Sequence, residues 1–102
     1  MFGNMMNKKM MGKMQEQMEV VKEKLNNISV IGEADNGNVK AVANGNRLLN
    51  SVTINEAFFK TATKEQLEEL IVTASNRALE QAERVEKSEM SHSMMGMLPG
   101  MG

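Results

Sequence analysis

The residues whose types and spacing best suit a binding chemistry are three lysines near the N-terminus, Lys8, Lys9 and Lys13. On a helix, side chains three or four positions apart are neighbours, and neither Lys8 nor Lys9 has an acidic residue at those distances. Lys9 and Lys13 repel each other, although Glu16 lies within reach of Lys13. Because an anion relieves such crowding of positive charge, we expect this cluster to contact phosphate groups. The alternative interpretation is a solvated basic face that maintains solubility.

Two arginines further along the chain, Arg77 and Arg84, form a second candidate site. They lie seven residues apart and therefore share one face of a helix. Glu80 precedes Arg84 by four residues, and Glu83 precedes Lys87 by four, which is the favourable order for ion pairs along a helix. We expect both pairs to form, which leaves Arg77 as the freer base.

Groups that could catalyse a reaction are scarce in this chain of 102 residues. It has no cysteine and a single histidine, so it lacks thiol nucleophiles and zinc–thiolate sites. An enzyme needs a nucleophile, an acid–base pair or a metal cage, whereas the carboxylates here lie mostly on predicted helix surfaces that face water. The sequence therefore predicts a protein that is not an enzyme and that has no cofactor and no small-molecule substrate.

One metal-binding alternative is the segment MSHSMMGM near the C-terminus. His92 lies there close to Met90, Met94 and Met95, whose soft thioethers suit Cu(I). Residues 90–102 are rich in methionine and glycine and show no periodicity, so we expect a flexible tail. A flexible tail would not hold these ligands in a fixed arrangement, and we therefore expect no metal site.

Charge and hydropathy restrict where the protein works. The net charge is −1, but residues 1–27 carry five lysines against three glutamates. Lysines interrupt the N-terminal methionines, so neither a membrane span nor a signal-peptide core is expected. The same segment has one phenylalanine and no tryptophan, which disfavours a membrane-surface helix. Together with the absence of cysteine, these features predict a soluble, cytoplasmic protein whose basic surface is N-terminal.

Methionines dominate the first of the predicted elements. Apolar residues recur there at alternating spacings of three and four, which predicts a helix over residues 4–27 whose apolar seam packs against another helix, that of a second copy in particular. Met5, Met6 and Met10 fall beside the seam, so we expect them to be exposed and available to a partner protein. The seam consists of Met11, Met14, Met18, Val21, Leu25 and Ile28.

Three segments with strand character follow, at residues 28–35, 38–44 and 47–55. Asn36-Gly37 separates the first two and is a strong hairpin signal, because a type I′ turn needs positive φ at both central residues. Asn44-Gly45-Asn46 supplies the second turn. In the third segment apolar and polar residues alternate, so one face is mostly apolar. The pattern predicts a three-stranded antiparallel meander that is covered on one side.

A second long helix is predicted over residues 64–89. Thr63 stands before it and Gln66 follows three residues later, which is the spacing of a capping box. Alanines at four-residue intervals in its middle would let another element approach closely. The apolar stripe consists of Leu67, Leu70, Ile71, Ala74, Ala78, Ala82 and Val85. Among these, we expect Ile71, Ala74 and Ala78 to take part in helix or dimer packing.

Several segments in this order carry a resemblance to a known family. They are the opening MFGNMM, the first helix rich in lysine, methionine and glutamine, then VIGEADNGNVKAVANGN, SVTIN, LEELIVTASNRALEQ and the closing MLPGMG. Their order and spacing over essentially the whole chain resemble the YbaB/EbfC family of bacterial nucleoid-associated DNA-binding proteins. The resemblance implies a small α/β homodimer whose helices project from a sheet-built core and bind DNA with little sequence preference.

The sequence thus predicts a single α+β domain over residues 1–89, in the order α-β-β-β-α, that forms a homodimer. By the resemblance first and the N-terminal charge second, we expect a nucleoid-associated protein that binds duplex DNA on its phosphates, organises or bridges the nucleoid and affects gene expression. The predicted DNA-binding residues are Lys8, Lys9, Lys13, Arg77 and Arg84. The alternative is a protein-binding adaptor that uses its methionine-rich N-terminal helix. DNA binding should weaken steeply with added salt, whereas methionine-driven binding should hardly respond.

Overall fold

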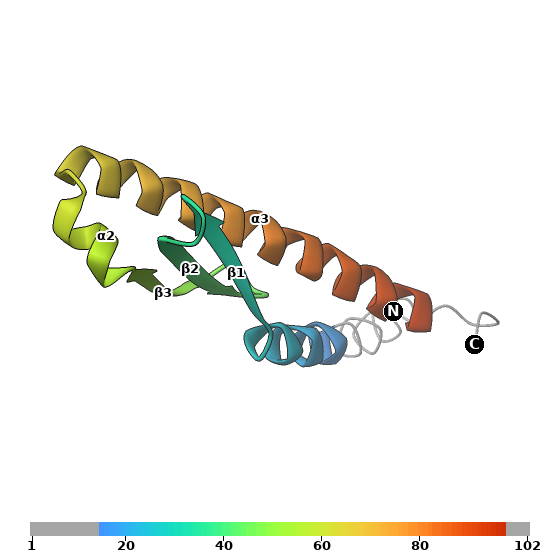
Figure 1. Ribbon diagram of the computed structural model, residues 1–102. Helices are drawn as coiled ribbons and strands as arrows, with labels where there is room; N and C mark the ends of the chain where they lie inside the picture. The colour runs from blue at the N-terminus through green and yellow to red at the C-terminus, as the bar shows by residue number, and fades with distance from the viewer. Residues whose placement is uncertain (1–14, 98–102) are drawn as a thin grey trace, which may run out of the picture.

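The computed structural model describes residues 15–97 and has a three-stranded antiparallel sheet with helices before and after it (Figure 1). Residues 15–26 are helical and form the described part of the N-terminal helix. The other elements are β1 (Ser29–Ala34), β2 (Val39–Asn44), β3 (Leu49–Ile54), α2 (Glu56–Thr61) and α3 (Lys64–Met97). This arrangement confirms the predicted α+β class and the three-stranded meander between helices.

Local turn chemistry sets the order and register of the strands. Asn36 and Gly37 have φ values of 55° and 87°, so the β1–β2 turn has the expected positive φ at both residues. In the β2–β3 turn, the side-chain oxygen of Asn44 accepts hydrogen bonds from the backbone N–H groups of Asn46 and Leu48, at 2.9 Å and 3.2 Å. The two turns produce the antiparallel order β1-β2-β3.

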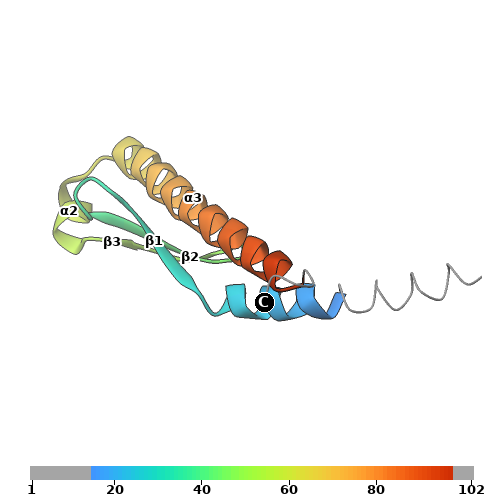
Figure 2. The same ribbon diagram turned by 90° about the vertical axis from the view of Figure 1, so that its right-hand side faces the viewer.

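Helix α3 lies across one face of the sheet at very short range (Figures 1 and 2). Gly32 of β1 faces it, and a Cβ at this position would overlap the backbone oxygen of Ala74 and the backbone nitrogen of Ala78. Only glycine on the strand and alanine on the helix permit this approach. The buried core is accordingly made of small side chains: Ala34, Val39, Ala41, Ala43, Ala74, Ala78 and Ala82.

The third strand is covered less well than the other two, because α3 contacts mainly β1 and β2. Val52 and Leu49 of β3 pair with Ala41 and Ala43, which are fully buried, and so point to the same side of the sheet. Yet Val52 remains 40% exposed and Leu49 46% exposed. We call these two residues the β3 strip, an apolar surface on the α3 side of the sheet.

The N-terminal helix is attached where its last turn meets the β2–β3 turn. Leu25 is almost completely buried, and its backbone oxygen accepts a hydrogen bond of 2.8 Å from the N–H group of Gly45. A Cβ at Gly45 would lie 2.8 Å from that same oxygen, so the close approach requires glycine. Asn44 donates to the side-chain oxygen of Asn26 at 3.1 Å, and the Asn46 side chain donates to the Lys22 backbone oxygen at 2.9 Å.

The predicted apolar seam of this helix is only partly buried in a single chain. Val21 and Leu25 are buried, whereas Met18 is exposed. Met11 and Met14 lie outside the described residues, as does the predicted helical stretch 4–14. Of the four described seam residues, two are thus buried within the chain, Ile28 is half-buried, and Met18 faces outward.

Two boundaries differ from the sequence-based expectation. Helix α3 continues through Met97, so residues 90–97 are helical and do not form the predicted flexible tail. No proline or glycine interrupts residues 90–95, and His92 and Ser93 line a cleft shared with the N-terminal helix, so tertiary contacts extend the helix. The short helix α2 was not expected, although Asn55 caps it by accepting a hydrogen bond from the N–H group of Phe58.

Candidate nucleic-acid interface

The first predicted site, formed by Lys8, Lys9 and Lys13, lies outside the described residues. The second, on α3, can be followed in atomic detail. Its helix starts at the predicted capping box: the N–H group of Gln66 donates to the Thr63 hydroxyl at 3.1 Å, and the N–H group of Thr63 donates to the Gln66 side chain at 2.9 Å. The reciprocal bonds fix the start of the helix that carries both arginines.

Arg77 is held by the sheet. Its guanidinium donates a hydrogen bond of 2.7 Å to the backbone oxygen of Glu33, a residue of β1. Because β1 is an edge strand, this oxygen has no partner strand on its outer side. Arg77 therefore has a structural role in tying α3 to the edge of the sheet.

Arg84 has the opposite environment. It is exposed, and within residues 15–97 it makes neither an ion pair nor a side-chain hydrogen bond. The expected pair between Glu83 and Lys87 is present at 3.1 Å, but the expected pair between Glu80 and Arg84 is not formed among the described residues. The expectation that Arg77 is the freer base was therefore wrong, since spacing along one helix cannot reveal a carbonyl on β1.

The ion pair between Glu83 and Lys87 affects the titration of the Glu83 carboxyl group. Lys87 donates a hydrogen bond to the Glu83 carboxylate and attracts it by charge, and together these hold the pKa of Glu83 below its ordinary value. Glu83 therefore remains ionised throughout the neutral pH range and keeps Lys87 occupied.

Two further ion pairs connect separate parts of the chain. Lys24 of the N-terminal helix lies 2.9 Å from Glu89 of α3, and Arg47 of the β2–β3 turn lies 3.4 Å from Glu86 of α3. We call the place where the N-terminal helix, the β2–β3 turn and α3 meet the junction. Its bases were not among the predicted site residues, because no local pattern relates positions 24 and 47 to acidic residues that lie 65 and 39 positions further along the chain.

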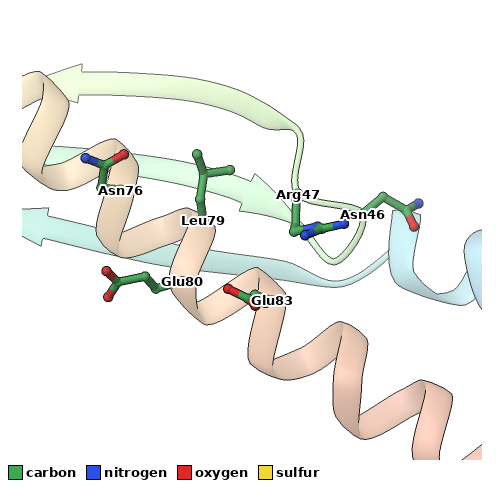
Figure 3. A pocket seen from close by; sticks show the side chains of 6 residues that line it. All are labelled: Asn46, Arg47, Asn76, Leu79, Glu80 and Glu83. Atoms are coloured by element: carbon green, nitrogen blue, oxygen red, sulfur yellow. The ribbon is translucent and has the colours of Figure 1, made fainter.

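An open cavity of about 610 Å³ lies next to the junction, between the β2–β3 turn and α3 (Figure 3). Figure 3 shows the turn residues on one side and the helix residues on the other, with charges of both signs. The lining residues are Asn46, Arg47, Asn76, Leu79, Glu80 and Glu83. This mixed lining suits contact with another charged surface better than enclosure of a small molecule.

Metal binding finds little support in this geometry. Within residues 15–97 there is no group of three or more histidine, cysteine or acidic side chains that could hold a metal ion. In helix α3, Met90 and Met94 are four residues apart and share a face, whereas His92 projects from the other side. These three of the four ligands named for the Cu(I) alternative therefore cannot converge on one ion from this helix. None of the described helices is long and apolar enough to cross a membrane.

Comparison with known proteins gives a consistent result. Residues 1–97 match the model of the YbaB/EbfC DNA-binding family. The nucleoid-associated protein TTE0040 of Caldanaerobacter subterraneus subsp. tengcongensis is 39% identical over 89 residues, which cover 86% of this chain and 80% of that protein. The nucleoid-associated protein Teth514_0034 of Thermoanaerobacter sp. strain X514 matches with the same identity and coverage.

A solved structure shares the fold. The crystal structure of the uncharacterized protein HP0035 from Helicobacter pylori superposes with a TM-score of 0.70 and covers 85% of this chain and 90% of its own. Its sequence identity of 18% supports the shared architecture only.

Proposed function

Because the chain belongs to the YbaB/EbfC DNA-binding family, we propose that it acts in the nucleoid by binding duplex DNA through phosphate contacts, with little dependence on base sequence. The observation that carries this proposal is the family match over residues 1–97, together with curated relatives that are named nucleoid-associated proteins. Membership in this family also means that the protein is not an enzyme.

The placement of the basic residues supports phosphate contacts. We assign the main contact to Lys8, Lys9 and Lys13 in the N-terminal segment, with Arg84 as a supporting base on α3. Arg84 is exposed and makes no ion pair within residues 15–97, so a phosphate would not have to displace a carboxylate to reach it. Arg77 is a weaker candidate than its charge suggests, because it already binds β1.

A homodimer would present these bases in pairs. The β3 strip is an apolar surface left open by α3, and the half-buried Leu79 lines the cavity between the β2–β3 turn and α3. That cavity also carries Arg47 together with Glu80 and Glu83. In a two-fold symmetric contact the same patch meets itself, so a patch with both signs of charge can pair its own opposite charges. Because the β3 strip is apolar and uncovered in the single chain, we assign it, together with this cavity, to contact with a second copy.

The dimer assignment is tested by Val52→Asp. A charged side chain in the β3 strip should convert the dimer into a folded monomer, because a buried unpaired carboxylate is costly at an interface. Thr53→Asp, on the other face of the same strand, is the matched control and should leave the dimer intact. Sedimentation equilibrium at micromolar concentration measures both. A parent chain that sediments as a folded monomer would refute the assignment.

DNA binding itself is tested with random-sequence duplexes. The parent should bind several unrelated duplexes with similar affinity, and the affinity should fall steeply as salt is raised. The variant with Lys8, Lys9 and Lys13 all changed to glutamine should bind all of these duplexes about tenfold or more weakly and with a flatter salt dependence, since each lost phosphate contact lowers the slope by about one. Equal binding by parent and variant at every salt concentration would exclude the N-terminal site.

The protein-binding adaptor is a second candidate function. Met18 and Val20 of the N-terminal helix are exposed in the single chain, and pliable methionines suit adaptable binding surfaces. Salt distinguishes the two functions, because apolar contacts hardly respond to it. Absence of any DNA complex at low salt would favour the adaptor.

A further inference from the structure

The two ion pairs at the junction join partners of unequal exposure. The side chains of Lys24 and Arg47 are 61% and 53% exposed, whereas those of Glu89 and Glu86, their acidic partners, are 20% and 28% exposed. The bases thus lie near solvent, where a phosphate could reach them, and the carboxylates lie beneath. Both carboxylates belong to α3 and are three residues apart, so they face the junction from neighbouring turns of one helix.

These ion pairs are not what holds the junction together. Val21 and Leu25 bury their side chains there, and the N–H group of Gly45 bonds to the Leu25 oxygen. The Asn44 and Asn46 side chains add two further hydrogen bonds to the N-terminal helix. Ion pairs with a half-exposed partner contribute little to stability in comparison with such buried contacts. Their main effect is on the availability of the two bases.

We propose that Glu86 and Glu89 form an autoinhibitory contact that withholds Arg47 and Lys24 from DNA phosphates. The inference rests on the proposed DNA-binding function and goes beyond it, because it concerns what limits the affinity. In the free protein each base is neutralised by a carboxylate of α3. A phosphate that takes over the base leaves that carboxylate without its cation, and the negative charge then repels the phosphate. Lys24 and Arg47 therefore contribute less to DNA binding than Arg84, which has no carboxylate to displace among the described residues.

In a chain of net charge −1, the contact also limits which bases are available to an anion. Acidic residues of α3 occupy three bases in its second half and at the junction: Lys87 by Glu83, Arg47 by Glu86 and Lys24 by Glu89. The DNA affinity is then determined by the bases that remain unoccupied. Removal of acidic partners, and not only addition of bases, should strengthen binding.

The test compares two double variants with the same change in net charge. Glu86→Gln with Glu89→Gln releases both junction bases. Glu65→Gln with Glu69→Gln is the matched control at the opposite end of α3, where both carboxylates are exposed and neither has an ion-pair partner among the described residues. Affinity for a random-sequence duplex is measured over a range of salt concentrations, and circular dichroism checks that both variants are folded.

The junction variant should bind about threefold to tenfold more tightly than the parent at moderate salt, and the slope of log affinity against log salt should steepen by about one to two. The control variant should change the slope little. Equal gains in both variants would overturn the inference, because a general charge effect would then account for them. Weaker DNA binding by the junction variant would also overturn the inference. Such a result would indicate that the ion pairs assist binding by positioning the N-terminal helix.

The bases themselves provide a second measurement. Lys24→Gln with Arg47→Gln should alter DNA binding little in the parent, where both are occupied, but should abolish the gain in the Glu86→Gln, Glu89→Gln background. If Lys24→Gln with Arg47→Gln weakened DNA binding equally in the parent and in the Glu86→Gln, Glu89→Gln protein, the two bases would not be withheld and the inference would fail. This cycle remains informative if one double variant folds poorly, because each ion pair can be tested with its own single variants. Failure of the parent and all variants to bind DNA at low salt would instead refute the proposed function.

Discussion

The two halves of α3 are one continuous helix, yet they are held in different ways. The first half, up to Ala82, packs its alanines on the sheet so closely that the strand opposite requires Gly32. The second half runs past the β2–β3 turn toward the N-terminal helix and forms the ion pairs of the junction (Figure 1). The comparison shows that one helix is used in two ways: its first half builds the core, and its second half carries the carboxylates that pair with Lys24, Arg47 and Lys87.

The largest effect is expected from a change that disrupts the packing of the first half of α3 on the sheet. Gly32→Ala places a methyl group against the backbone of Ala74 and Ala78, and backbone atoms cannot move aside as a flexible side chain does. We expect a loss of about 3 kcal/mol or more in the free energy of unfolding, or failure to fold. Urea unfolding at fixed protein concentration measures it. Gly37→Ala, at a turn with positive φ where a Cβ would make only ordinary contacts with the flexible side chains of Lys40 and Glu33, should cost only about 1 kcal/mol. Similar losses in both variants would contradict the close packing.

The next effect concerns the junction that holds the second half. The buried side chain of Asn44 makes three hydrogen bonds, to Asn26, Asn46 and Leu48. Asn44→Ala leaves these partners unsatisfied and should lower the free energy of unfolding by about 2 kcal/mol. Asn50→Ala, an exposed position in β3, is the control and should change it by less than about 0.5 kcal/mol. Equal unfolding midpoints for the two variants would show that the polar network contributes nothing.

The two arginines allow a direct contrast within one helix. Arg77→Gln removes the bond to β1 and should lower the free energy of unfolding by about 1 kcal/mol, with little change in DNA affinity. Arg84→Gln should leave the free energy of unfolding unchanged but weaken DNA binding a few-fold. It should also reduce the slope of log affinity against log salt by about one. Paired unfolding and binding measurements decide the matter. The contrast would be lost if Arg77→Gln proved to be the variant with the larger binding defect.

The smallest effect is on pH dependence. Because Lys87 holds the pKa of Glu83 below its ordinary value of 4.5, the ion pair stabilises the folded state fully above that pH. This contribution is lost as the pH falls through the lower pKa of the folded state. The pair is exposed, so we expect only a small shift in the unfolding midpoint. The midpoints of the parent and Glu83→Gln should converge as the pH falls from above 4.5 through the lower pKa of the folded state. A difference that is constant over this range would exclude the ion pair as its cause.

Much of the fold follows from local patterns. The turn at Asn36-Gly37 has the expected positive φ values, and the capping box of Thr63 and Gln66 forms as its spacing indicates. These features depend on residues within four positions of one another, where backbone sterics and local hydrogen bonds decide the outcome. The helix, meander and helix order and the family resemblance were therefore accessible from the sequence.

The three-dimensional packing decided the rest, because it depends on which distant segments meet. Arg77 binds an oxygen of β1 that lies 44 positions away, and Arg47 meets Glu86 across 39 positions, so no periodicity along α3 could assign these partners. Packing against the N-terminal helix carries α3 past Glu89, where composition alone indicated a tail. The sequence determined by itself the three strands, the turns between them and the start of α3, since each depends on short-range interactions. Only the tertiary structure decided which bases are occupied and which apolar residues remain uncovered, because burial and ion pairing depend on all the elements at once.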